Sequence, residues 1–190
     1  MHVTMTPDEW SLFSGFVRCA RRYVEFGSGA STVLAAALAG ESVTTFDSST
    51  AWLDRVAEDC RARATRLSPK LTFVDIGETE NWGFPKGEAT RGRWPDYHAG
   101  MWDDPAVSQG DFYLVDGRFR VACFIQVMLH AGAGALVGFH DYASRPHYHD
   151  AALIGREIVR VHDLSIFVRP ADFDADAARK LLETYAYDPR

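Results

Sequence analysis

The chain has 190 residues, of which 47% are hydrophobic and 24% are charged, values typical of a globular protein. This composition excludes a disordered, collagen-like or disulfide-scaffold protein, and the length predicts a single domain over residues 1–190 with its own core. Lys and Arg number 20 against 26 Asp and Glu, and the net charge of −6 disfavours nucleic acid and anionic membranes as partners.

The cysteines and the first residues bear on the cellular compartment. Cys19, Cys60 and Cys123 are widely separated and odd in number, so we expect reduced core thiols rather than a disulfide or zinc framework. The opening MHVTMTPDEW lacks the basic and apolar regions of a signal peptide, and no apolar run approaches the ~18 residues of a membrane span. These features predict a cytoplasmic, untargeted protein.

The first predicted element is a helix within residues 1–22. Thr6-Pro7-Asp8-Glu9 has the form of a capping box, in which the side chains of Thr6 and Glu9 satisfy amides of the first turn. From Trp10 to Ala20, apolar residues recur at three- and four-residue spacing, which predicts one buried face.

After this helix, strand and helix patterns alternate. The predicted strands cover residues 23–26, 42–46, 71–76, 111–115 and 134–139, and the predicted helices cover 31–39, 50–64 and 119–131. Because parallel neighbours need crossover helices, this order predicts a doubly wound, mostly parallel α/β sheet with helices on both faces. Segments 158–161 and 164–168 are too close together for a crossover, so we expect a terminal antiparallel hairpin, followed by a helix over 175–186.

Residues 78–110 interrupt this alternation with a long irregular segment. It carries Trp82, Trp94 and Trp102 among glycines, prolines and charged residues. Long irregular connections inside compact domains are uncommon and often form lids or binding loops. Two interpretations stay open, and both can hold at once: a lid over a ligand, or aromatic residues that clamp the segment onto the sheet.

Two glycines occupy the predicted turn between the first strand of the sheet and the next helix. Gly27 permits a tight turn, and Gly29 lets a ligand approach the backbone because it has no Cβ. Asp47 ends the next strand, where a carboxylate can accept hydrogen bonds from both hydroxyls of a ribose. This order of strand, glycine turn, helix and strand-end acid predicts a nucleoside-binding site.

Two further positions discriminate among nucleosides. Thr32 stands where a dinucleotide fingerprint has Gly or Ala, which disfavours NAD. Glu25 lies two residues before the turn, where an acid would repel a pyrophosphate but suits a ligand with an ammonium group. These residues favour S-adenosylmethionine. Pairing of Glu25 with Arg21 or Arg22 stays open as a structural alternative.

Four short motifs follow the predicted strands in order: Glu25-x-Gly27-x-Gly29-x-Ser31, Asp47, Asp75-Ile76-Gly77 and Asp116-Gly117. Together they resemble the ordered motifs of class I S-adenosylmethionine-dependent methyltransferases, a Rossmann-like family, over roughly residues 20–170. The resemblance implies a seven-stranded sheet whose last strand is antiparallel, in agreement with the hairpin above.

The same resemblance assigns roles around the cofactor. The implied cofactor-binding residues are Glu25, Gly27, Ser28, Gly29, Ser31, Asp47, Ile76 and Asp116. Within this set the glycine turn holds the methionine part, Asp47 holds the ribose and Ile76 contacts adenine. Ser31 replaces the commonest third glycine, and can cap the helix and offer a hydroxyl.

Polar residues also follow two neighbouring predicted strands. Asp116 comes directly after the first, and His140 and Asp141 come after the second, so we expect all three at the carboxyl edge of the sheet, where ligands bind. We predict these three as the catalytic residues. His140 is the general base, because its ordinary pKa of about 6.5 lies near working pH.

The same two acids resemble the magnesium ligands of the catechol O-methyltransferase-like branch. The Asn that usually completes that set is missing, so magnesium stays an alternative and no metal site is predicted. Arg118 and Arg120 either bind an acidic substrate or pair with the acids, and for Arg120 the structural role is favoured. The His147-Tyr148-His149 stretch indicates a surface or substrate-facing role rather than a metal site.

The function predicted from the sequence is methyl transfer from S-adenosylmethionine to a hydroxyl or amine of a small molecule or glycan. Two alternatives stay open. The first is a methyltransferase-like protein that binds the nucleoside without turnover, and the second is an NAD-linked oxidoreductase.

Overall fold

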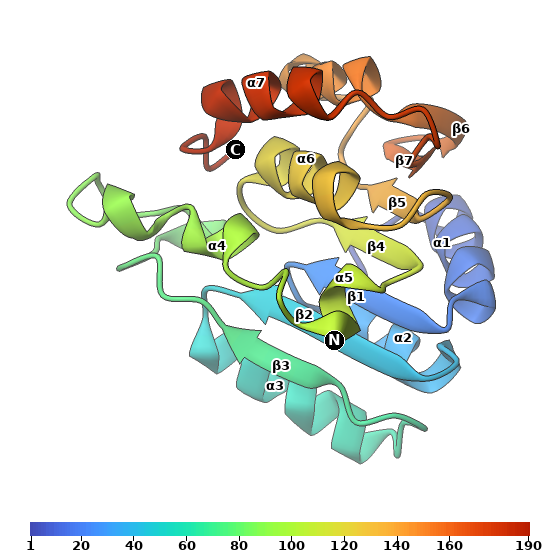
Figure 1. Ribbon diagram of the computed structural model, residues 1–190. Helices are drawn as coiled ribbons and strands as arrows, with labels where there is room; N and C mark the ends of the chain where they lie inside the picture. The colour runs from blue at the N-terminus through green and yellow to red at the C-terminus, as the bar shows by residue number, and fades with distance from the viewer.

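The computed structural model describes residues 1–190 and contains one seven-stranded sheet with the order β3-β2-β1-β4-β5-β7-β6 (Figure 1). The strands are β1 (Arg22–Phe26), β2 (Ser42–Asp47), β3 (Lys70–Phe73), β4 (Phe112–Val115), β5 (Leu136–Phe139), β6 (Arg156–Val161) and β7 (Leu164–Val168). Strands β1 to β5 are parallel, and β7 runs antiparallel to both β5 and β6. The predicted doubly wound sheet with a terminal hairpin is confirmed.

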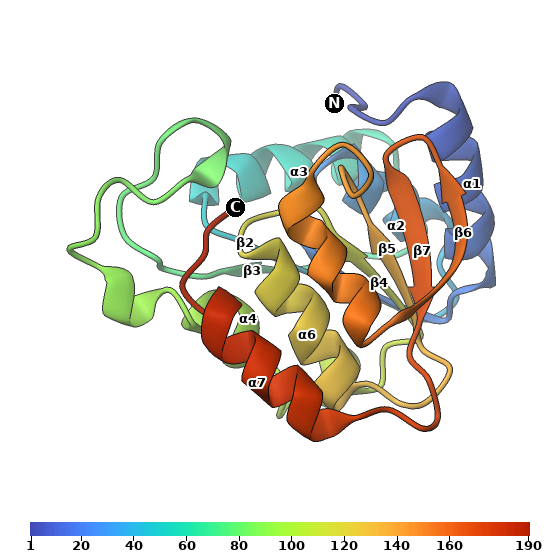
Figure 2. The ribbon, with the colours of Figure 1, turned by 90° about the horizontal axis from the view of Figure 1, so that it is seen from above.

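Helices cover both faces of the sheet (Figures 1 and 2). The long helices are α1 (Pro7–Cys19), α2 (Ala30–Leu38), α3 (Thr50–Ala62), α6 (Arg120–His130) and α7 (Ala175–Tyr185). The short ones are η1 (Asn81–Gly83), η2 (Arg91–Arg93), α4 (Asp96–Ala99), α5 (Pro105–Ser108) and η3 (Pro146–Leu153). None of the helices is long and apolar enough to span a membrane.

The two largest apolar clusters lie on opposite faces of the sheet, and a third, small one lies between α2 and α3. On one face, Phe13 and Val17 of α1 pack with α2 against Tyr23 and Phe112 of the sheet. On the other face, α6 is buried along most of its length in a larger core. Burial on both sides explains why β4 is wholly apolar, and β1 is buried from Tyr23 to Phe26 even though it includes Glu25.

The predicted strand over residues 71–76 is too long at its carboxyl end. β3 is an edge strand that pairs only with β2, and β2 ends at Asp47, whose register partner is Phe73. Beyond Phe73 there is no further strand to pair with. Cys60 and Cys123 are buried, as expected of core thiols, whereas Cys19 is exposed at the end of α1 and the expectation of a core position is wrong there.

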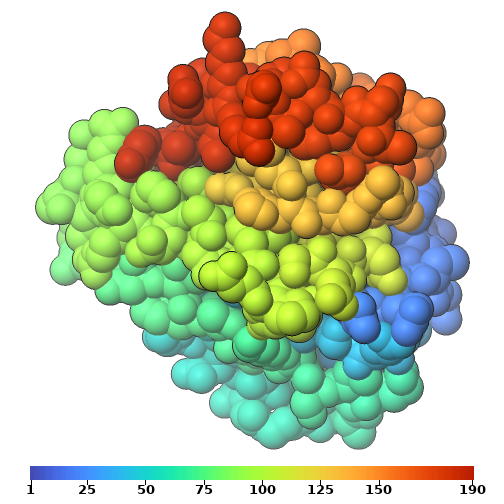
Figure 3. Space-filling model, in the orientation of Figure 1, coloured from blue at the N-terminus to red at the C-terminus, as the bar shows by residue number.

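The irregular segment over residues 78–110 divides into two parts. Trp94 and Trp102 are buried, and they pack against Phe119 and stack on His130, respectively. Figure 3 shows this part of the surface (green) lying closely against its neighbours. The clamp interpretation therefore holds for the second part. Trp82, in the first part, is 82% exposed, and the lid interpretation stays a prediction for residues 79–84.

The Glu9 carboxylate links α1 to the terminal hairpin. The capping box is present: Thr6 Oγ1 accepts from the Glu9 amide, and Glu9 Oε2 accepts from the Thr6 amide at 2.7 Å. Glu9 Oε1 also accepts from the amide of Asp163, in the turn between β6 and β7, at 2.8 Å. Burial opposes ionisation of Glu9, but these hydrogen bonds outweigh it and lower the pKa of this carboxyl.

Replacing Glu9 tests this link. We expect Glu9→Ala to lower the free energy of unfolding by about 1–3 kcal/mol for each amide left unpaired, measured by urea denaturation. Glu9→Gln, which keeps an acceptor, loses less, and the exposed Glu58→Ala on α3 is the matched control.

Because the pKa of Glu9 is lowered on folding, the stabilisation is present above its ordinary pKa and is lost as the pH falls through the lowered value. Equal stabilities of Glu9→Ala and Glu58→Ala at neutral pH contradict the proposed link.

Candidate cofactor and active site

A cavity of about 730 Å³ lies at the carboxyl ends of β1, β2, β4 and β5. Glu25 and residues 27–31, 47–49, 116–118 and 140–141 line it. Residues 79–84 also contribute to the wall. In this sheet the chain reverses its winding between β1 and β4, the place where open α/β sheets bind ligands.

The turn after β1 depends on glycine at one position. Gly27 has φ +94°, and a Cβ built there would lie 2.6 Å from the amide nitrogen of Gly117, in the turn after β4. Gly29 is extended, with φ 173°, and a Cβ there would meet only Ser31 Oγ at 3.9 Å. The tight turn therefore belongs to Gly27, and Gly29 leaves the cavity side of the backbone open.

Glu25 is a buried acid that no cation neutralises. Its side chain accepts hydrogen bonds from the hydroxyls of Ser31 and Thr32, the latter at 2.6 Å. Arg21 and Arg22 pair with Glu41 instead, so the alternative of an arginine partner for Glu25 is wrong. Burial raises the pKa of Glu25 to about 8, against the opposing effect of the two hydroxyls.

The Asp47 carboxylate fastens the glycine turn to the start of α3. One oxygen accepts from the amide and the hydroxyl of Ser28, at 3.0 and 2.8 Å, and the other accepts from the amide of Ser49 at 3.0 Å. Burial raises the pKa of Asp47, and these hydrogen bonds partly offset it. Trp52 donates its indole N–H to the carbonyl of Ser28 and also lines the cavity.

Sequence reasoning missed Ser49 and Trp52. The available signal was their position immediately after the β2 acid, at the start of the next helix. Conversely, the structure does not bring Ile76 to the cavity: it is fully buried in the core, because the chain leaves β3 at Phe73 and turns inward. Thr79 and other residues further along line the cavity instead.

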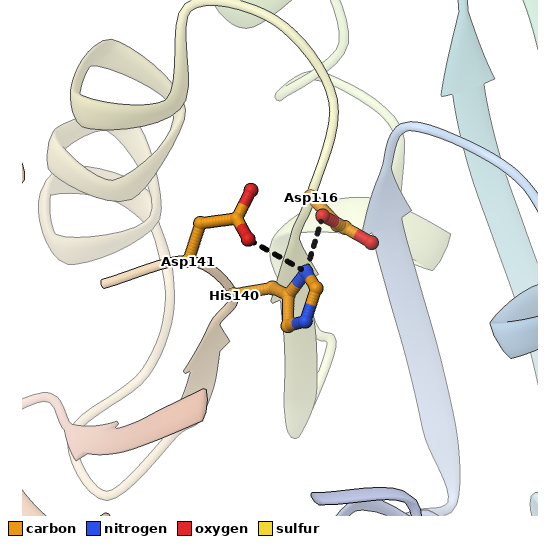
Figure 4. A group of neighbouring side chains, drawn as sticks. All are labelled: Asp116, His140 and Asp141. Carbon is orange, nitrogen blue, oxygen red and sulfur yellow. Dashed lines mark hydrogen bonds and ion pairs between the residues drawn. The ribbon is translucent and has the colours of Figure 1, made fainter. Parts of the chain in front are cut away.

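Asp116, His140 and Asp141 lie together at the ends of β4 and β5 (Figure 4). His140 Nδ1 is 3.0 Å from Asp116 Oδ1 and 3.7 Å from Asp141 Oδ1. His140 is buried, and because Nδ1 faces the carboxylates, Nε2 is the ring nitrogen left to exchange a proton with a ligand. The expected convergence of the three side chains is therefore present.

Two arginines already neutralise these acids. Buried Arg120 lies 3.2 Å from Asp116 and 3.0 Å from Asp141, and Arg145 lies 2.8 Å from Asp141. The three candidate ligand atoms lie within 4.8 Å of one another, but a divalent cation there would sit against a buried guanidinium. The residues therefore do not fit magnesium, and Arg120 has the structural role favoured by the sequence.

The acids around His140 control its protonation. Burial lowers the pKa of the imidazole, but the charge and hydrogen bond of Asp116, with the charge of Asp141, outweigh burial and raise it overall. The pKa of Asp116 is lowered despite burial, mainly by Arg120 and His140. Asp116 thus both orients the imidazole and makes it a stronger base.

We expect Asp116→Asn to lower the pKa of His140, measured by NMR titration of the ring, because the charge and acceptor that favour imidazolium are removed. The exposed Asp54→Asn on α3 is the control. An unchanged His140 pKa in Asp116→Asn contradicts the role given to Asp116.

The raised pKa of His140 also determines how the free energy of unfolding changes with pH. Protonated His140 contributes stability below its ordinary pKa of about 6.5, and this contribution is lost as the pH rises through the raised folded value. Asp116→Asn is expected to flatten that part of the curve of unfolding free energy against pH.

No protein-family model and no curated protein matches the chain. A methyltransferase-like protein from Silicibacter pomeroyi is similar to it with a TM-score of 0.88 and 29% identity, over 99% of this chain and 98% of that one.

Two more distant solved structures share the fold. An O-methyltransferase from Bacillus cereus, in complex with SAH, has a TM-score of 0.61 and 14% identity over 86% of this chain and 82% of its own. An O-methyltransferase from Streptomyces achromogenes, in complex with SAM, also has a TM-score of 0.61 and 14% identity. The similarity covers 89% of this chain and 82% of that one.

Proposed function

Because the chain belongs to the class I methyltransferase family, we propose that it transfers a methyl group from S-adenosylmethionine to a hydroxyl or amine of a small molecule or glycan. The net charge of −6 supports a small acceptor over a nucleic acid. When bound, the cofactor supplies an electrophilic methyl group. The protein then has to hold the two substrates in line and to remove a proton from the acceptor.

The observation that carries the cofactor assignment is the lack of a cation beside Glu25. This acid is 1% exposed, lines the cavity, and has only hydroxyl partners. A buried carboxylate is stabilised by a charged partner, and the ammonium group of S-adenosylmethionine supplies one. A dinucleotide would bring a pyrophosphate to the same turn, against the acid. Glu25 therefore supports S-adenosylmethionine over NAD.

The remaining cofactor contacts follow from the edge of the sheet. Ser28 and Gly29 line the cavity, and Asp47 beside them, which accepts three hydrogen bonds within the protein, has acceptor capacity left for a ribose hydroxyl. Ser31 acts through Glu25, because its hydroxyl is committed to that acid. Asp116 forms an ion pair with Arg120 and a hydrogen bond with His140. We therefore propose that it orients the His140 imidazole rather than binding the cofactor.

His140 is the proposed general base. Asp116 holds Nδ1, so that Nε2 receives the proton of the acceptor, and the raised pKa of the ring strengthens it for that step. Asp141 faces the same ring nitrogen and is held by Arg120 and Arg145, so it acts by fixing the edge on which His140 lies. No step requires a metal ion.

The cofactor assignment is tested by titration calorimetry with S-adenosylhomocysteine. We expect binding to the wild type and no binding of NAD. Asp47→Ala should weaken the binding of S-adenosylhomocysteine by about 1.5–3 kcal/mol for each hydrogen bond lost, because the ribose loses a charged acceptor.

Asp54→Ala, exposed on α3, is the matched control. Asp47→Asn keeps an oxygen for Ser28 and separates loss of charge from loosening of the turn. Wild-type affinity in both Asp47 variants contradicts the ribose assignment.

The role of His140 is tested by turnover. With an acceptor identified by screening for S-adenosylhomocysteine release, His140→Ala should lower turnover by about 10²–10⁴ and leave S-adenosylhomocysteine affinity intact. The activity should resist EDTA. Loss of activity in EDTA restores the magnesium alternative, and absence of turnover on every acceptor supports a nucleoside-binding protein.

A further inference from the structure

Arg118 is a buried cation without an anionic partner. The residue is 6% exposed, lies in the turn after β4, and lines the cavity. Its Nε and one terminal nitrogen are buried with no hydrogen-bond partner, and it forms no ion pair. The neighbouring acids are already taken, because Asp116 pairs with Arg120 and His140.

A buried guanidinium without an anionic partner lowers the stability of the ligand-free protein. Removing a charge from water is unfavourable unless hydrogen bonds and an opposite charge replace the lost hydration. Desolvation and the charge of Arg120 lower the pKa of Arg118, in keeping with this lack of compensation. A buried charge that remains unpaired within the fold indicates a partner that arrives with the ligand.

Arg118 is enclosed on most sides, since Nε and one terminal nitrogen are buried, and it meets the cavity through the small surface that remains. The guanidinium lies over the ring of Phe84, with its central carbon 4.0 Å from the ring centre, so one face is covered by an aromatic side chain. The planar edge of a stacked guanidinium carries N–H donors in the geometry that matches a carboxylate or a phosphate. The ligand class is therefore an oxyanion.

The cofactor has a carboxylate of its own, and the β1 turn offers that carboxylate a separate set of donors. Glu25 and the first amides of α2, at Ala30 and Ser31, lie at the β1 turn, and these amides have no acceptor within the protein. The amino and carboxyl groups of the methionine part are attached to the same carbon. Glu25 can therefore bind the amino group while the amides at the start of α2 bind the carboxylate. Arg118 is not part of that set: it follows Gly117 in the β4 turn and stacks on Phe84 of the predicted lid.

We propose that Arg118 binds a carboxylate or phosphate group of the methyl acceptor, so that the substrate is an acid. This inference rests on the proposed methyltransferase function. His140, at the end of the neighbouring strand β5, is then the base for a hydroxyl or amine elsewhere on the same acidic molecule.

The test uses the full chain and two variants, Arg118→Gln and Arg118→Leu, with the exposed Arg179→Gln on α7 as the matched control. Benzoate, phenyl phosphate and neutral benzamide are titrated into the S-adenosylhomocysteine-saturated protein. We expect an anion to bind the wild type and the control, and to bind Arg118→Gln about 10- to 100-fold more weakly. Benzamide should not distinguish the proteins.

Thermal unfolding without ligand gives a second readout. Arg118→Leu should raise the melting temperature, because it replaces an uncompensated buried charge by an apolar side chain. A lower melting temperature, or equal anion binding in the wild type and Arg118→Gln, overturns the proposal and makes Arg118 a packing residue. Absence of anion binding to the wild type overturns it as well.

A third titration separates the two carboxylate sources. 5′-Methylthioadenosine lacks the amino acid part of the cofactor. If Arg118→Gln weakens the binding of S-adenosylhomocysteine but not that of 5′-methylthioadenosine, Arg118 binds the cofactor carboxylate and the acceptor assignment is wrong. If the wild type does not bind S-adenosylhomocysteine at all, the proposed function fails. The anion titration of the ligand-free protein then still decides whether Arg118 binds oxyanions.

Discussion

The contact between the turns after β1 and β4 determines the shape of the site. Gly27 and Gly117 approach so closely that a Cβ on Gly27 would lie 2.6 Å from the Gly117 amide nitrogen. Hydrogen bonds from the Gly27 amide to Phe46 and from the Asp116 amide to Phe26 hold the turns in register with the sheet. This contact brings the glycine turn and the acid after β4 to one cavity, although they are far apart in the sequence.

Within that cavity the buried ionisable groups are unevenly supplied with partners of opposite charge. The network at the ends of β4 and β5 is balanced, because Asp116 and Asp141 share Arg120, Arg145 and His140. Glu25 has no cation, and Arg118 has no anion. Balanced groups hold their geometry without a ligand, and unbalanced ones favour a ligand of opposite charge. The fold thus separates the residues that position the chemistry from those that select the bound molecules.

The segment over residues 78–110 shows where pattern reasoning stops. Its aromatic residues look alike in the sequence, yet Trp94 and Trp102 belong to the core, while Trp82 is exposed and lines the cavity. An indole serves either purpose, and the choice depends on which surface lies opposite. Ile76 illustrates the same point, because the turn after an edge strand decides whether a residue faces the ligand or the core.

The sequence by itself determined the sheet, the glycine turn, the strand-end acids and the family resemblance, because these depend on local periodicity and on residue types at short spacing. Only the tertiary structure decided which charges are paired. Glu25 has arginines three and four residues away in the chain, but they pair with Glu41. Arg118 stands two residues from Asp116, but Arg120 takes that carboxylate. Charge pairing depends on distances and burial across strands, which sequence spacing does not specify.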